Sequence, residues 1–76
     1  MTKYEKLALE MTAGLMNAVA ALAVANGAKS ELLSVNLPNL TPEQRQELQE
    51  DSEVQMTNAQ QLKNAAANLK LILENN

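Results

Sequence analysis

The chain has 76 residues and a net charge of −3, and it contains neither Cys nor His. This length allows one domain, which buries only about 60% of the surface that the unfolded chain exposes. Domains below roughly 70–80 residues usually need disulfides, a metal or oligomerisation, and the composition excludes disulfides and Cys/His metal sites. Oligomerisation or close helix packing is left to stabilise the fold.

The composition favours helix. Alanine is the best helix former, Leu, Met, Glu, Gln and Lys follow it closely, and these residues dominate the chain. Tyr4 is the only aromatic residue, and no segment shows the alternation of apolar and polar residues that is typical of strands. The sequence therefore predicts an all-α protein.

The first predicted helix covers about residues 2–27. Thr2 is a suitable N-cap with Glu5 three residues later as its capping-box partner, and Gly27 is suited to end the helix. Apolar residues recur at alternating spacings of four and three, the heptad pattern that two helices need to lie along one another. They are Tyr4, Ala8, Met11, Leu15, Ala18, Leu22 and Ala25, and a second apolar line on another face holds Leu9, Met16, Val19 and Ala23.

The middle of this helix is uncharged on every side, because no charged residue lies between Met11 and Ala28. A helix that is apolar nearly all round is buried nearly all round, whereas one neighbouring helix covers only one side. We therefore expect the other side to face a second chain, a membrane or a protein partner, and burial inside an oligomer is the favoured explanation. A membrane span is less favoured, because the stretch is rich in alanine and contains Asn17 and Asn26, whereas insertion depends on Leu, Ile, Val and Phe.

The second predicted helix covers about residues 42–74, after a short helical turn at residues 30–35 and a loop. Thr41 fits the N-cap, Pro42 the first helical position, and Gln44 the reciprocal position of a capping box. The first part of this helix is mostly Glu, Gln and Asp, and the last part is rich in Leu, Ala and Ile. The four-three spacing continues through Leu48, Ser52, Gln55, Ala59, Leu62, Ala66, Leu69 and Leu73.

These elements predict one domain over residues 1–76: a two-helix antiparallel hairpin that assembles into a helical bundle. We expect the apolar parts of both helices to form the oligomer interface. Asn17 is included because a buried Asn can fix the register of a helix interface. The predicted interface residues are Met11, Leu15, Asn17, Ala18, Leu22, Leu62, Ala66, Leu69 and Leu73.

The predicted function is a non-enzymatic protein-interaction module with a structural or scaffolding role, either a dimeric four-helix bundle or a larger assembly. The carboxylates follow a solvated helix face, so no catalytic residue, metal or cofactor is expected. The six scattered Lys and Arg residues predict no nucleic-acid binding, and the start of the sequence lacks a secretory pattern, which predicts a cytoplasmic location. The alternative is a small acidic regulator or inhibitor, such as one from a phage or mobile element, that docks on another protein.

Overall fold

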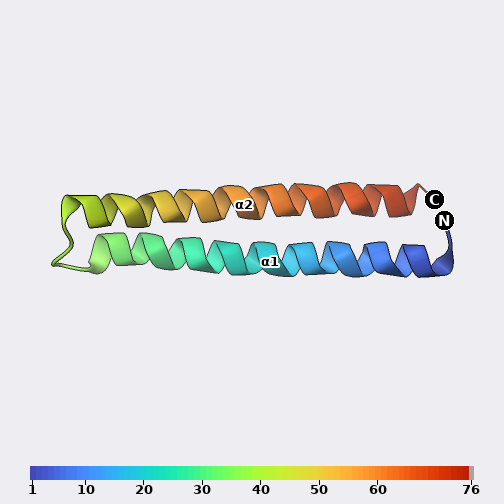
Figure 1. The fold of residues 1–76 in the computed structure, drawn as a ribbon, viewed down its shortest axis with the longest axis horizontal. Helices are drawn as coiled ribbons and strands as arrows, with labels where there is room; N and C mark the ends of the chain where they lie inside the picture. Colours follow the sequence, from blue (N-terminus) through green and yellow to red (C-terminus); the bar gives the residue numbers. More distant parts are fainter. Residues whose placement is uncertain (76) are drawn as a thin grey trace.

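The computed structural model describes residues 1–75, which form two long helices. Helix α1 spans Lys3–Asn36 and helix α2 spans Pro42–Glu74. The two helices lie side by side along their whole length with the chain termini at one end and the loop, residues 37–41, at the other (Figure 1). The prediction of an all-α antiparallel hairpin is confirmed.

Both helices begin where their capping residues predict. The Thr2 hydroxyl accepts a hydrogen bond from the Glu5 backbone N–H at 3.1 Å. At the start of α2, the Thr41 hydroxyl accepts from the Gln44 N–H at 3.1 Å, and the Gln44 side-chain oxygen accepts from the Thr41 N–H at 3.0 Å. Each bond satisfies a backbone donor that a helix start otherwise leaves without a partner.

The predicted end of the first helix at Gly27 is wrong. Helix α1 runs through Gly27 and through the separate turn expected at residues 30–35, and it ends at Asn36. Gly27 is buried and its φ angle is not positive, so it does not adopt the conformation that ends a helix. Its missing side chain serves the approach of the two helices, because a Cβ atom there would lie 3.2 Å from the Cβ atom of Gln55 and 3.2 Å from the carbonyl oxygen of Ser52.

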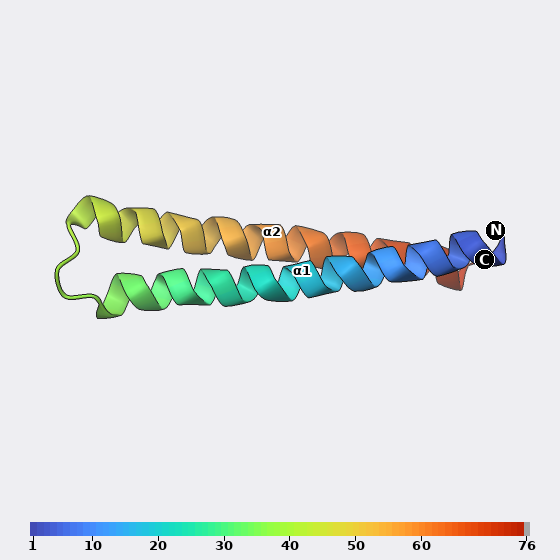
Figure 2. The ribbon, with the colours of Figure 1, turned by 60° about the horizontal axis from the view of Figure 1, so that its bottom comes forward.

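The hairpin is a thin rod, with principal extents of 57 × 13 × 12 Å. Its radius of gyration is 17.1 Å, whereas a compact domain of this length has about 11 Å. The view in Figure 2 shows the helices apart near the loop and overlapping near the termini, so they coil about each other. Two helices therefore make the whole structure, with no third element to cover their outer sides within residues 1–75.

The contact between the helices is built from small side chains at every seventh position. This repeat keeps one seam facing the partner helix, and small residues in it let the backbones approach closely. Ser34, only 1% exposed, is the largest side chain that is fully enclosed, while Val24 and Leu62 pack at the margin of the seam. The buried residues at this spacing are Ala20, Gly27 and Ser34 in α1 and Ser52, Ala59 and Ala66 in α2, and Ala23 of α1 is buried beside them.

Candidate association surface

Helix α1 carries two heptad rows, and only one of them faces α2. The inner row is buried or half-buried against α2 and consists of Leu9, Ala13, Met16, Ala20, Ala23, Gly27, Ser30 and Ser34. The outer row is the heptad pattern of the sequence, Tyr4, Ala8, Met11, Leu15, Ala18, Leu22 and Ala25, and all of its members are exposed. The two rows are offset by five positions, which turns the outer row about 140° around the helix from the inner one.

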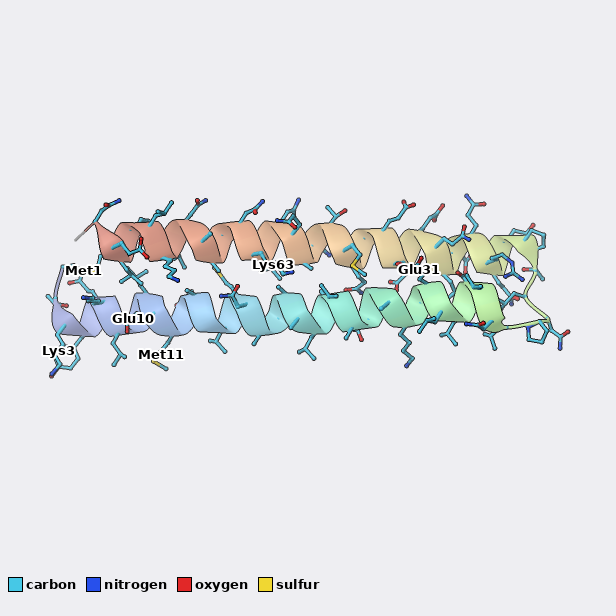
Figure 3. The ribbon with its side chains drawn as sticks, turned by 180° about the vertical axis from the view of Figure 1, so that it is seen from behind. Met1, Lys3, Glu10, Met11, Glu31 and Lys63 are labelled. Atoms are coloured by element: carbon cyan, nitrogen blue, oxygen red, sulfur yellow. The ribbon has the colours of Figure 1, made fainter. Side chains whose placement is uncertain are left out.

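The outer row exposes large apolar side chains to solvent. The exposed fraction is 82% for Tyr4, 61% for Met11, 66% for Leu15 and 64% for Leu22. Figure 3 shows Met11 pointing away from α2 on the free side of α1. A continuous apolar patch of this kind is typical of a surface that another molecule covers.

The residues predicted as one interface lie on two different surfaces. Met11, Leu15, Ala18 and Leu22 are on the outer row and are exposed. The α2 members are instead half-buried or buried in the seam of the hairpin, facing α1. They are Leu62, Ala66, Leu69 and Leu73. The sequence did not separate these surfaces because both rows of α1 have the same spacing.

Asn17 belongs to neither row of α1. It is exposed and lines a shallow groove between the helices together with Glu10, Lys63 and Lys70. Its amide therefore does not lie inside the contact between α1 and α2. Asn17 was predicted to fix the register of a helix interface from a buried position, and within the hairpin it is not buried. The outer-row residues missing from the predicted interface are Tyr4, Ala8 and Ala25, although the heptad spacing had already marked them.

The grooves along the hairpin differ in charge. Near the termini, one groove is lined by charged side chains, among them Lys6, Glu10 and Lys70. Another groove, beside the Ala20–Ala59 contact, has no charged lining residue. Among residues 1–75, no group of three or more acidic side chains converges so that it could hold a metal ion. The uncharged groove is lined by Val19, Ala23, Gln55, Asn58, Gln61 and Leu62.

Charge is also divided along the rod. The loop end, residues 29–53, carries six acidic and two basic side chains, a net charge of −4. The open end, residues 1–28 and 54–75, carries three acidic and four basic side chains, a net charge of +1. The termini and the loop lie at opposite ends of the rod (Figure 1). The loop end is therefore acidic and the open end slightly basic.

Two polar contacts join α1 to α2 near the loop end of the hairpin. The Ser30 hydroxyl donates to the carboxylate of Asp51 at 2.5 Å. The Arg45 guanidinium donates to the backbone carbonyl of Ser34, in the last turn of α1. That turn contains no basic residue of its own, so Arg45 supplies the cation that a helix C-terminus favours.

Helix α1 is also long and apolar enough to cross a membrane. Its most apolar window has a mean hydropathy of 1.7, and 11% of that window is buried in the hairpin. This property rests on length and composition alone. A helix of a soluble assembly whose free side is covered by a second chain has the same properties.

The sequence matches no protein-family model, no curated protein and no solved structure. The exposed outer row of α1 and the distribution of charge along the rod are therefore the features of the molecule that bear on its function.

Proposed function

We propose that this chain is a non-enzymatic association module with a structural or scaffolding role, in which a second copy covers the outer row of α1. The observation that carries the proposal is the exposure of Tyr4, Met11, Leu15 and Leu22 on one uncharged side of the helix. A dimer formed through this row would hold four helices, with the two α1 helices at its centre and the two α2 helices on the outside, because the row lies about 140° from the side of α1 that faces α2.

The total accessible surface supports this association. The hairpin exposes 5650 Å², whereas a folded monomer of 8.3 kDa exposes about 4,600 Å². The excess is about 1,000 Å², and a stable interface buries about 800 Å² on each partner. Covering the outer row would bring the exposed area of each chain to that of an ordinary folded protein.

The composition of the seam supports it as well. Full burial of a Leu side chain contributes about 1.5–3 kcal/mol, but the fully enclosed side chains of this hairpin are no larger than serine. The leucines of the seam, such as Leu9 and Leu69, are only half-buried, while Leu15 and Leu22 of α1 stay largely in water. Association would bury them and stabilise the hairpin at the same time.

Sedimentation of a Leu22→Glu variant tests the proposal. In an isolated hairpin this substitution is nearly neutral, because the side chain is already 64% exposed and surface changes usually stay within about 0.5 kcal/mol. In an assembly it places a charge in the interface, so we expect dissociation together with loss of helical circular dichroism. Leu71→Glu is the matched control: Leu71 is 55% exposed but lies on α2, so that variant should keep the mass of the wild-type particle.

Two results would count against self-association. One is a wild-type chain that sediments as a stable monomer at micromolar concentration. The other is a Leu22→Glu variant that remains folded with unchanged stability. Either result would mean that the hairpin is stable with its outer row exposed to solvent.

The acidic loop end favours one alternative function, a small regulator or inhibitor that docks on another protein. Its net charge of −4 is concentrated within residues 29–53, and opposite charge on a partner would steer such an encounter. In this case the isolated chain should bind hydrophobic dyes through its uncovered outer row and lose that signal when the partner is added. A monodisperse oligomer without dye binding would instead support self-association.

We propose that the module acts in the cytoplasm. Association with a membrane is a third possible function, because α1 is long and apolar enough to cross one. Flotation with liposomes distinguishes the two. A self-associating soluble bundle stays at the bottom of the gradient, whereas a chain whose α1 enters lipid rises with the vesicles.

A further inference from the structure

We propose that two copies pair through the outer rows of α1 in antiparallel orientation, with Lys29 of each copy against Tyr4 of the other. This inference rests on the self-association proposed above and adds its orientation and register. In this register Ala8 lies opposite Ala25 of the second copy, and Met11 lies opposite Leu22. The loop end of each hairpin then lies beside the open end of the other.

The position of Lys29 separates the two orientations that the pair could take. Lys29 continues the spacing of the outer row, one step beyond Ala25, so a helix packed on this row meets it. In a parallel pair, the two copies of Lys29 would face each other, and like charges at a helix contact are destabilising. In the antiparallel pair, each Lys29 lies by the aromatic ring of Tyr4, where a cation is attracted to the ring face, and the charges of Lys3 and Glu5, one on each side of Tyr4, offset each other.

Side-chain size selects the register. With Lys29 against Tyr4, the alanines of the outer row meet each other near the ends, Met11 meets Leu22, and Leu15 meets Ala18 at the centre. Sliding by one heptad in one direction places the charge of Lys29 against Met11. Sliding in the other direction leaves the apolar row beyond Leu22 uncovered.

Disulfide capture tests the orientation cleanly, because the chain has no Cys of its own. We would prepare Ala8→Cys and Ala25→Cys, two small substitutions at exposed positions, and oxidise each variant alone and both in an equal mixture. A disulfide requires Cα atoms about 4.4–6.8 Å apart. In the proposed pair, position 8 is next to position 25 of the second copy but about 25 Å from the second copy's position 8. Thr57→Cys, on the exposed side of α2, measures disulfides formed by random collision.

The proposed pairing is supported if the mixture forms disulfide-linked dimers while each variant alone stays at the level of Thr57→Cys. Linkage within each variant alone would overturn the orientation in favour of a parallel pair. A dimer in sedimentation that forms no disulfide in any mixture would overturn the register, since a shift of one heptad moves the positions about 10 Å apart. A monomer in sedimentation would overturn self-association itself, so the two proposals fail in different ways.

The dimer Kd of a Lys29→Ala variant provides a second test, because the two orientations predict changes in Kd of opposite sign. The variant removes both of the symmetry-related attractions to Tyr4, each about 0.5–1 kcal/mol, and would raise the dimer Kd about five- to thirtyfold. In a parallel pair the same change removes a repulsion and lowers the Kd. A lower or unchanged Kd therefore contradicts the antiparallel pair.

Discussion

Gly27 of α1 lies so close to Ser52 of α2 that a Cβ atom at Gly27 would stand 3.2 Å from the Ser52 carbonyl oxygen. The same added atom would stand 3.2 Å from the Cβ atom of Gln55. Both neighbours are held by the α2 backbone and cannot turn aside as the end of a long side chain can. Close packing of the two backbones at this point is therefore what the glycine provides.

Two glycine substitutions should have opposite effects. A Cβ at Gly14 meets nothing within 4 Å, so Gly14→Ala should raise the free energy of unfolding by about 0.5–1 kcal/mol through helix propensity. Gly27→Ala offers the same gain but forces α2 outward, so we expect it to lower stability. Urea unfolding followed by circular dichroism measures both. Equal stabilisation by the two variants would show that the helices are not in close contact at Gly27.

Enlarging a seam alanine should be costly. Ala20 is 0% exposed, and it packs against Ala59 and Ala23, so Ala20→Leu must push the helices apart. Overpacking of this kind costs about 1–3 kcal/mol, which would lower the thermal midpoint by several degrees. Ala67→Leu makes the same change at an exposed position of α2 and should leave the midpoint nearly unchanged. If both variants melt alike, the seam is looser than its burial indicates.

Removing the guanidinium of Arg45 should loosen the loop end. Arg45→Met keeps an apolar stem but loses the hydrogen bond to the Ser34 carbonyl, and we expect a loss of about 0.5–1.5 kcal/mol in unfolding free energy. Lys63→Met removes the same charge in the middle of α2, away from any helix end, and serves as the comparison. Hydrogen exchange should speed up in the last turn of α1 for Arg45→Met only. Faster exchange in both variants would assign the effect to net charge.

Thermal stability should depend on protein concentration. If folding of the hairpin is coupled to covering of the outer row, association stabilises the folded chain by mass action, and the melting midpoint rises as the chain is concentrated. Leu71→Glu should show the same rise. Leu22→Glu should melt at a low midpoint that does not change with concentration. A wild-type midpoint that is constant over a hundredfold range would contradict coupled folding.

Local chemistry determined much of the fold in advance. The capping box of Thr41 and Gln44 and the proline at position 42 placed the start of α2, because those signals depend only on residues within one turn. The heptad spacing of α2 identified the row that faces α1, although Leu62, Ala66, Leu69 and Leu73 of that row had been predicted to form the oligomer interface. The two-helix hairpin followed from these signals and the intervening loop.

Tertiary contact decided the two matters that local signals left open. Gly27 can end a helix or allow a close approach, and only the neighbouring α2 backbone selects the second role. Helix α1 has two rows of equal spacing, and the hairpin buries the one with the smaller side chains, because these let two long helices lie close along their whole length. The row with the larger side chains, from Tyr4 to Leu22, is left on the surface, and this selection creates the surface through which we propose association.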